Sequence, residues 1–375
     1  MKINAFRSTI LSISLAVAFA PTAVFASTGD DKDIQGLISA AQDEAPITVY
    51  APSGKIVQTA ENFTKKYGVQ AVGTKVSSSA QVEMMIREYR ANNIRGDVII
   101  TGDASATVAQ LLPMGMAESW VSPTLKSDIA DYAKDPLLVY GDPAVWTYNT
   151  EIHAECPVNN IWALTDSKWN RRVAIPDPLN KASFLDWFNQ LEMHHDKQIA
   201  EAYKQYFGKP LDISKESATV SWVKALAKNS PLPTDSDSAA GDTVGAPGQT
   251  DSFVGFMSTA KYRDVAQGKV HLGICDTMYP FVGWSTPGYG VISTKTQSPN
   301  AAKLFLHFLM TEEGISNQTV DGKVSGNQSI PANQNEASGV QNVYSNILQY
   351  DATTGMEDFD NRQDWADIWR INFTR

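Results

Sequence analysis

Cysteine is scarce in this chain of 375 residues, in which only Cys156 and Cys275 carry a thiol. An oxidising compartment would allow the two thiols to pair. Two cysteines so far apart in the sequence do not by themselves establish a disulfide, and the sequence leaves both the paired and the free state open.

Long hydrophobic runs are also lacking, apart from one near the start of the chain at residues 10–20. Lys2 and Arg7 precede this run, and the small residues of Val24-Phe25-Ala26 follow it. This order is typical of a secretory signal peptide, and the run is too short for a membrane span. We expect a signal peptide over residues 1–26 and an exported, periplasmic protein with no direct membrane insertion.

Sequence motifs of common enzymes are missing. The chain contains no G-x-S-x-G, no H-E-x-x-H and no phosphate-binding P-loop. Residues 258–261 match S-x-x-K of penicillin-binding enzymes, but the accompanying S-D-N and K-T-G are absent. A secreted hydrolase of phosphate esters would need a metal cluster or an activated nucleophile, so we expect no enzyme, no catalytic residue, no cofactor and no bound metal.

Positive charge is in deficit, with 31 Lys and Arg against 41 Asp and Glu. Without Lys2 and Arg7 of the signal peptide the basic residues number 29, which gives a net charge of −12. An acidic exported protein is a poor candidate for binding nucleic acid. A small anionic ligand stays possible, because a local site can be positive within a negative surface.

The first hundred mature residues alternate between strand and helix patterns. Residues 47–50 predict a strand, residues 56–67 a helix that ends at Gly68, and residues 97–100 a buried strand. Such alternation favours a parallel sheet with helices on both faces, in which ligands bind beyond the carboxyl ends of the strands. The loops expected there, residues 52–54, 77–79 and 101–103, are rich in glycine and hydroxyl groups.

Three consecutive serines begin the helix predicted after residue 76. Ser78 and Gln81 fit an S-x-x-Q capping box, and an apolar stripe with helical spacing follows. The stripe is Val82, Met85, Ile86 and Tyr89. Hydroxyls and free backbone N–H groups at such an N-terminus suit an anion, although serines also cap ordinary helices.

The rest of the chain predicts a second α/β region. Residues 137–140 and 144–150 are expected to be strands that cross towards it, and residues 271–276 a strand that returns. A strand at residues 173–176 precedes a helix marked by Phe184, Trp187, Phe188 and Leu191. We expect residues 234–251 to be a long loop, and two helices after residue 340.

From about residue 47 to residue 314 the chain resembles the extracellular solute-binding proteins of ABC importers (family 1), in the branch that contains the ferric-ion-binding proteins. The likeness is carried by residues 162–169 (WALTDSKW), 173–178 (VAIPDP), 265–270 (VAQGKV) and 299–305 (PNAAKLF). The resemblance implies an α/β, type II periplasmic-binding-protein fold, with two lobes joined by crossing hinge strands and the ligand between them. It also implies delivery to an inner-membrane ABC permease.

The expected ligand depends on the subgroup. Ferric-binding members use two neighbouring tyrosines, whereas residues 276–281 (DTMYPF) contain one and no Tyr-Tyr pair occurs in the chain. Ferric ion needs several anionic oxygens, so iron is the alternative. Residues 244–249, 253–257 and 194–196 are similar to features of hexose-phosphate-binding relatives, which implies a small phosphorylated solute such as glucose 6-phosphate.

These arguments give an expected site and expected domains. We expect lobe 1 to comprise residues 46–147 and 277–340, lobe 2 residues 148–276, and residues 341–375 to pack near lobe 2 and the hinge in a monomer. His195 and Asp196 are expected to bind sugar hydroxyls or to face water, Asp276 and Tyr279 to lie in the cleft or pack at the hinge, and Asp103 and Asp177 to touch ligand or cap helices. The phosphate is expected to be held by Ser53, Gly54, Ser77, Ser78 and Ser79.

Overall fold

The computed structural model describes residues 29–374, so the expected signal peptide lies outside the described residues. The described residues form one curled sheet, whose strands are β1 (Ile47–Ala51), β2 (Ala71–Lys75), β3 (Val98–Thr101), β4 (Ala117–Glu118), β5 (Leu137–Tyr148), β6 (Val173–Pro176), β7 (Leu232–Thr234), β8 (Val254–Ser258), β9 (Gly273–Ile274), β10 (Gly283–Ser293), β11 (Val324–Ser325) and β12 (Ile347–Gln349).

Helices cover the sheet on both faces, and none of those described has the length and apolarity needed to cross a membrane. They are α1 (Gly29–Gln42), α2 (Ile56–Tyr67), α3 (Ser78–Ala91), α4 (Ala104–Ala106), α5 (Ala182–Gln190), α6 (Asp196–Phe207), α7 (Ala218–Lys228), α8 (Asp237–Gly245), α9 (Arg263–Ala266), α10 (Pro299–Leu309), α11 (Glu312–Thr319), α12 (Gly355–Asp360) and α13 (Arg362–Asn372).

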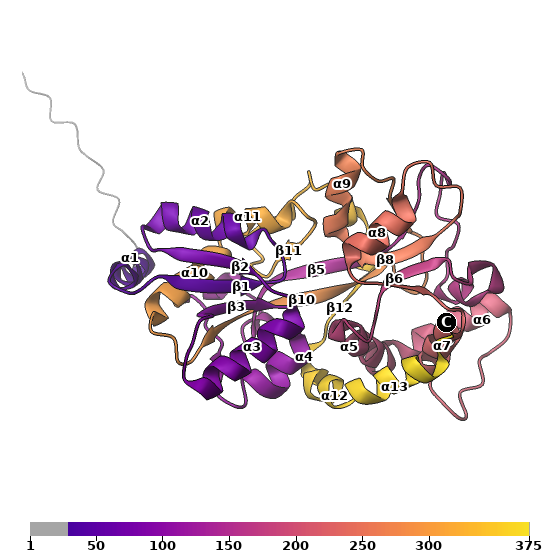
Figure 1. Cartoon of the computed structure of the whole chain (residues 1–375), viewed down its shortest axis with the longest axis horizontal. Coiled ribbons are helices and arrows are strands. Elements are labelled where there is room, and N and C mark those ends of the chain that lie inside the picture. The colour runs from indigo at the N-terminus through magenta and orange to yellow at the C-terminus, as the bar shows by residue number, and fades with distance from the viewer. Residues whose placement is uncertain (1–28, 375) are drawn as a thin grey trace, which may run out of the picture.

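The main strand order, β2-β1-β3-β10-β5-β8-β6-β7, divides the molecule into two lobes (Figure 1). In the first lobe β1 runs parallel to β2 and β3, and in the second lobe β6 runs parallel to β7 and β8. The two long strands β5 and β10 pair antiparallel and pass through both lobes. The α/β fold with crossing hinge strands is therefore confirmed, whereas the residue boundaries expected for the lobes stay a prediction.

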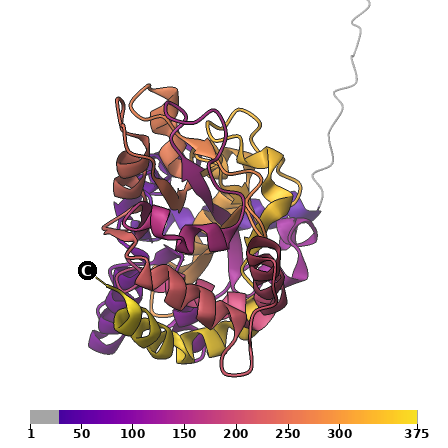
Figure 2. The same ribbon diagram turned by 90° about the vertical axis from the view of Figure 1, so that its right-hand side faces the viewer.

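Each lobe has its own hydrophobic core. In the first lobe Phe63 of α2 packs against Phe305 and Phe308 of α10. In the second lobe Trp187 of α5 stacks on Phe256 of β8, with ring centroids 4.6 Å apart. Helices lie on either side of the strands of this lobe when it is viewed from its end (Figure 2). Two separate cores joined by two strands leave room for a cleft between the lobes.

The helix predicted over residues 56–67 is confirmed, and the spacing of its apolar residues explains which face of the helix is buried. Ile56, Ala60, Phe63 and Tyr67 are spaced for one face of a helix and are all buried. The helix ends at Gly68, whose φ of 71° is the left-handed conformation that glycine adopts without strain.

Three local predictions are wrong. Ser77 rather than Ser78 precedes α3, it makes no side-chain cap, and Gln81 donates to the carbonyl of Val76, so no capping box forms. Residues 234–251 are not a loop throughout, because the side chain of Ser236 caps α8. Residues 271–276 contribute only the short β9, and the chain returns to the first lobe through β10.

Cys156 and Cys275 form a disulfide, which answers the question that the sequence left open. Their Cα atoms are 5.1 Å apart and 119 positions separate them in the sequence. In the chain-entropy model a loop of this size stabilises the folded state by about 5 kcal/mol.

The two C-terminal helices predicted after residue 340 are present, and they run along one side of the molecule (Figure 1, yellow). Helix α12 contacts α4 of the first lobe and α5 of the second, and α13 contacts α5 and α7. The end of the chain therefore spans both lobes.

Candidate functional site

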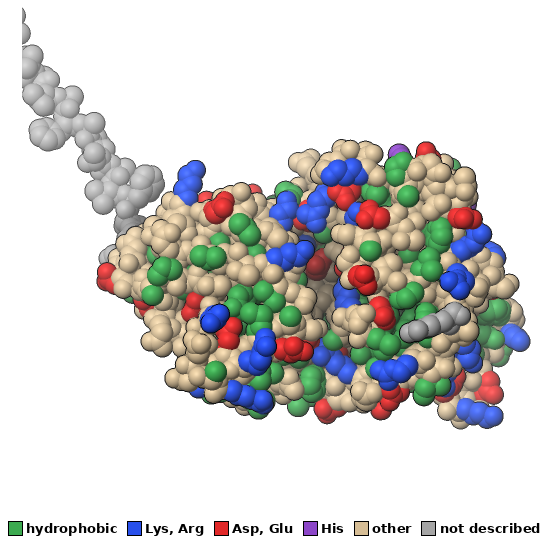
Figure 3. Space-filling model, viewed as in Figure 1, with side chains coloured by type: hydrophobic (Ala, Val, Ile, Leu, Met, Phe, Trp, Pro, Cys, Tyr) green, Lys and Arg blue, Asp and Glu red, His purple; other side chains and the backbone are tan. Residues whose placement is uncertain are grey.

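A cavity of about 690 Å³ lies between the two lobes (Figure 3). The residues that follow β1, β2 and β3 line it from the first lobe, and those that follow β6, β7 and β8 line it from the second. The carboxyl ends of six strands thus meet at one place, which is where ligands bind in open α/β sheets.

The wall from the first lobe contains the beginnings of α2 and α3. Ser53, Gly54 and Lys55 precede α2, and residues 77–79 stand at the start of α3. The Oγ of Ser78 accepts a hydrogen bond from the N–H of Gly102 at 3.0 Å. Two helix N-termini with hydroxyl groups therefore face the cavity, and both favour negative charge.

The wall from the second lobe contains the beginnings of α5 and α8. Lys181 precedes α5, and its Nζ lies 2.8 Å from Oδ2 of Asp237, the first residue of α8. Burial alone would raise the pKa of Asp237, but the Lys181 ammonium and the N–H of Ser258 outweigh it and lower that pKa. Asp237 is consequently a charged, already paired carboxylate.

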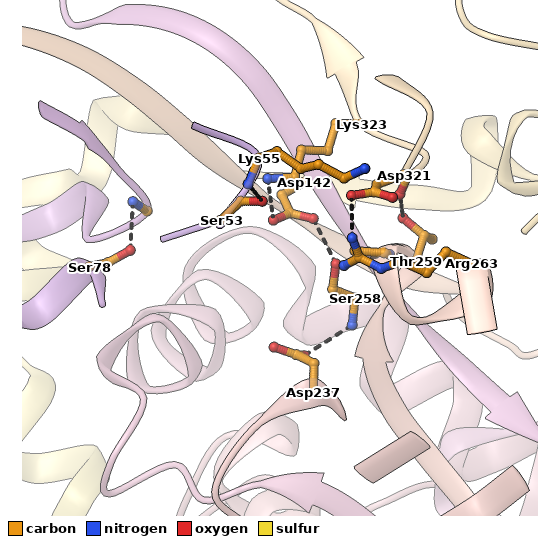
Figure 4. A network of polar contacts seen from close by, with 12 residues as sticks. Ser53, Lys55, Ser78, Asp142, Asp237, Ser258, Thr259, Arg263, Asp321 and Lys323 are labelled. Carbon is orange, nitrogen blue, oxygen red and sulfur yellow. Dashed lines mark hydrogen bonds and ion pairs between the residues drawn. The ribbon is translucent and has the colours of Figure 1, made fainter. Parts of the chain in front are cut away.

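Hinge residues form the floor of the cavity. Lys323 is 3 % exposed, with its Nζ 3.3 Å from Oδ2 of Asp142 and 4.0 Å from the centre of the Tyr140 ring. Burial opposes its charge, but Asp142 and Tyr140 outweigh burial and raise the pKa of Lys323. The hydroxyl of Ser258 donates to Oδ1 of Asp142 at 2.9 Å, so both oxygens of this carboxylate are engaged (Figure 4).

Arg263 and Asp321 form a second link between the lobes at the cavity. Nη1 of Arg263, from the second lobe, lies 3.0 Å from Oδ2 of Asp321, from the first (Figure 4). The hydroxyl of Thr259 donates to the carbonyl of Asp321 at 3.0 Å. Burial raises the pKa of Asp321, and Arg263 is the strongest influence that opposes this rise.

Positive and negative side chains both line the cavity, and most of each sign are already in ion pairs. In the part of the chain that the structure describes, Lys55 and Lys75 have no ion-pair partner, and both belong to the first lobe. The paired cations are Lys181, Lys261, Arg263 and Lys323. Two lysines without an ion-pair partner therefore line the cavity from the lobe that also carries the N-termini of α2 and α3, although Lys55 also acts on Asp321 and lowers its pKa.

Seven of the residues expected in the site line this cavity: Ser53, Gly54, Ser77, Ser78, Ser79, Asp103 and Asp177. Asp177 also accepts hydrogen bonds from the N–H of Leu179 and the side chain of Asn180, so it organises its own turn.

The other four expected residues are not among those that line the cavity, which favours the alternatives to a place in the cleft. His195 lies at the far end of the helical segment that begins at the cavity, where its Nδ1 is 2.9 Å from Gln198. Asp196 accepts hydrogen bonds from the N–H and hydroxyl of Thr219 at the start of α7.

Asp276 and Tyr279 follow β9, which pairs with the end of β5 in the second lobe rather than with the crossing. Asp276 is exposed, and the backbone of Tyr279 exchanges hydrogen bonds with that of residues 159 and 161.

The sequence analysis does not name several of the cations that line the cavity. Lys55 and Lys75 flank the serine-rich loops, so their position beside a predicted anion site was a usable signal. Arg263 and Lys323 come from distant segments and carry no local signal.

Metal ligands are few in the described residues. Within residues 29–374 no group of three or more His, Cys, Asp or Glu side chains is placed to hold a metal ion. Tyr140, whose ring lies beside Lys323, is the one tyrosine among the residues that line the cavity.

Solved structures of similar fold bind different solutes. AfuA from Actinobacillus pleuropneumoniae, with fructose-6-phosphate bound, matches with a TM-score of 0.65 and 20% identity over 87% of this chain and 99% of its own. Iron-bound HitA from Pseudomonas aeruginosa matches with 0.65 and 15% over 88% and 99%. A substrate-binding protein of an Agrobacterium tumefaciens ABC transporter matches with 0.66 and 15% over 90% and 97%.

At these identities the likeness shows the fold, that of type II periplasmic binding proteins. No curated protein matches the sequence. Residues 47–317 match the family model described as bacterial extracellular solute-binding protein, which covers more than half of the chain. The chain therefore belongs to the bacterial extracellular solute-binding proteins, the solute-capturing components of ABC importers.

Proposed function

We propose that this protein captures a small phosphorylated solute, a hexose phosphate such as glucose 6-phosphate, and delivers it to an ABC permease. The observation that carries the proposal is the anionic half-site on the first lobe. There the N-termini of α2 and α3, four serine hydroxyls and two lysines face one cavity, and within the described residues neither lysine has an ion-pair partner. The serines are Ser53, Ser77, Ser78 and Ser79.

The opposite wall suits the hydroxyl groups of a sugar. Asp177, Asn180 and Thr234 line it from the ends of β6 and β7, and Ser236 and Ser238 from the start of α8. These side chains include both hydrogen-bond donors and acceptors, as a polyhydroxyl ligand requires. A ligand with a phosphate at one end and hydroxyls at the other would touch both lobes, and such contacts favour closure.

Ferric ion is less well matched to the cavity. A hard trivalent cation needs several free anionic oxygens. The carboxylates of Asp142 and Asp237 are engaged by Lys323 and Lys181. Arg362 engages Oδ1 of Asp103, so that within the described residues one oxygen of Asp103 and the carboxylates of Asp177 and Asp235 are the lining oxygens without a cation. Lys55 and Lys75 would in addition repel a cation. We therefore propose the phosphorylated solute in preference to iron, although an iron-bound protein shares the fold.

We further propose that the protein acts in the periplasm as a monomer, without catalysis. The family supports a small-molecule ligand and a permease partner. Members of this family bind solutes for transport, which supports binding rather than hydrolysis.

Thermal unfolding of ligand-stripped mature protein in phosphate-free buffer tests the proposal. A ligand at a hundred times its dissociation constant stabilises the folded state by about 2.7 kcal/mol, which raises the Tm by several degrees. We expect a rise with glucose 6-phosphate or fructose 6-phosphate, and none with glucose or ferric citrate. A rise with ferric citrate alone would show that the ligand is iron.

A further inference from the structure

Arg362 is the first residue of α13 and lies beyond residues 47–317, the region that matches the family model. Its guanidinium nevertheless reaches the boundary between the lobes. Its Nη2 lies 2.5 Å from Oδ1 of Asp103 and 2.8 Å from Oδ2 of Asp186. Its Nε lies 2.7 Å from Oδ1 of Asp186. One side chain of the C-terminal segment thus binds two carboxylates, one of them with two parallel hydrogen bonds.

The two carboxylates belong to different lobes, and both are connected to the cavity. Asp103 follows β3 in the first lobe and lines the cavity itself. Asp186 is on α5 of the second lobe, the helix whose first residues, Ala182 and Ser183, line the opposite wall. The hydroxyl of Ser105 in the first lobe donates to Oδ1 of Asp186 at 3.0 Å. Arg362 therefore sits where three segments of the chain meet.

This junction is buried, so its geometry is well defined. The side chains of Arg362, Asp103 and Asp186 are 16 %, 5 % and 3 % exposed. Burial raises the pKa of Asp186, and the Arg362 guanidinium is the largest influence that opposes the rise. The ring of Phe359 lies 5.4 Å from Cζ of Arg362 and covers it from α12. A planar guanidinium held on several sides fixes the orientation of the groups that it binds.

Asp103 has one oxygen left for a ligand. Its Oδ1 receives Arg362, whereas within residues 29–374 its Oδ2 has no hydrogen-bond partner and keeps a small exposed surface. Because Asp103 lines the cavity, Oδ2 can accept a hydrogen bond from a ligand hydroxyl.

We propose that Arg362 is a positioning residue for solute recognition. It holds Asp103 by Oδ1, so that Oδ2 accepts a hydroxyl of the solute, and it ties this acceptor to Asp186 of the other lobe. This inference rests on the proposed function, in that the solute carries hydroxyl groups as well as a phosphate. Selectivity for the whole solute over free phosphate then depends on a residue outside the cavity and outside the segment that defines the family.

Titration calorimetry with glucose 6-phosphate and with inorganic phosphate tests this role. Inorganic phosphate has no sugar hydroxyl, so it reports the phosphate half-site alone. We expect Arg362→Gln to weaken glucose 6-phosphate binding by about tenfold, which corresponds to the loss of one charge-assisted hydrogen bond between the solute and Asp103. Binding of inorganic phosphate should weaken by less than twofold. Arg362→Lys keeps the positive charge but cannot donate two parallel hydrogen bonds to one carboxylate. Its affinity for glucose 6-phosphate should lie between those of Arg362→Gln and the wild type, and this variant replaces Arg362→Gln in the test if the latter does not fold.

Arg370→Gln is the matched control, because Arg370 lies on the same helix and pairs with the exposed Asp367. It should leave both affinities unchanged. Equal weakening of both ligands by Arg362→Gln and Arg362→Lys would show a general structural role and overturn the inference, as would no change in either.

Hydrogen exchange of the ligand-free protein tests the junction without any ligand. Arg362→Gln should speed exchange of the amides around Asp103 and around Asp186, on both lobes, and Arg370→Gln should not. If the wild type binds neither ligand, the proposed function is wrong and the hydroxyl role of Asp103 falls with it. Unchanged exchange around both Asp103 and Asp186 in Arg362→Gln would show that Arg362 does not hold the two lobes together.

Discussion

The Oγ of Ser78 accepts a hydrogen bond from the backbone N–H of Gly102 at 3.0 Å. This contact joins the N-terminus of α3 to the loop after β3, so two of the loops at the cavity are held as one surface. Because the oxygen of Ser78 is the acceptor, its O–H proton is left to be donated into the cavity. The relationship explains how a serine at this helix start can order the site and also bind an anion.

Replacing Ser78 and Ser79 together by alanine should weaken glucose 6-phosphate binding by at least tenfold, because two hydroxyl donors to a charged phosphate are lost. Folding should be nearly unaffected, since neither side chain belongs to a core. Titration calorimetry measures the first effect and thermal unfolding the second. Ser127→Ala, at an exposed serine of the same lobe, is the control, and an unaltered affinity in the double variant would remove the phosphate loop from the account.

Lys55→Ala and Lys75→Ala should each weaken binding of the phosphorylated solute by about three- to tenfold, because each removes a cation without an ion-pair partner from the wall that faces the phosphate. The loss should shrink as ionic strength rises, since salt screens charges that are partly open to solvent. Affinities at low and at physiological salt test this prediction. Lys65→Ala, at an exposed lysine in the last turn of α2, should have no effect, and an equal loss there would point to long-range charge rather than to the site.

Lys323→Met should lower the free energy of unfolding by about 3–5 kcal/mol, because it leaves the Asp142 carboxylate without its cation at the hinge. Asp142 is partly exposed, which favours the lower end of that range. Urea denaturation gives the measurement. Lys66→Met, which breaks an exposed pair with Glu313, should cost at most about 1 kcal/mol. Similar costs for the two variants would mean that the hinge pair does not matter to stability.

Asp358 should make stability depend on pH. It is fully buried on α12 and accepts hydrogen bonds from Asn189 and Gln190, and burial raises its pKa from 3.8 to about 6. The folded state therefore holds the proton more tightly than the unfolded state. Its stabilising contribution is complete below pH 3.8 and is lost as the pH rises through 6, a change of about 3 kcal/mol.

Urea denaturation of wild type and Asp358→Asn between pH 4 and pH 7.5 tests this sign. The free energy of unfolding of the wild type, minus that of the variant, should fall as the pH rises. Asp360→Asn, at an exposed position of the same helix, should give a difference that is flat with pH. A difference that rises with pH would contradict the assignment.

The parts of the site that the sequence predicted are those that are local in the chain. Ser53 and Ser77 follow strands in an alternating pattern, and parallel strands bring the loops at their carboxyl ends together whatever the rest of the fold does. The expected crossing of the chain between lobes was also confirmed, although β10 rather than residues 271–276 makes the return.

The failures have physical reasons. Helix α5 begins at the cavity with Ala182, so His195, thirteen residues further along a helical path, lies roughly 20 Å away at about 1.5 Å per residue. The partners of Arg263 and Arg362 are set by tertiary packing between segments far apart in the chain, and no periodicity or motif marks them. The disulfide depends in the same way on the approach of two distant segments.

In the proposed site, the phosphate of a sugar phosphate provides the binding energy on the first lobe. Titration calorimetry of the wild type with glucose 6-phosphate and with glucose, in phosphate-free buffer, compares ligands that differ only in that group. We predict that glucose 6-phosphate binds at least a hundredfold more tightly than glucose, a difference of about 3 kcal/mol. Equal affinities, or no binding of glucose 6-phosphate beside tight binding of ferric ion, would contradict it.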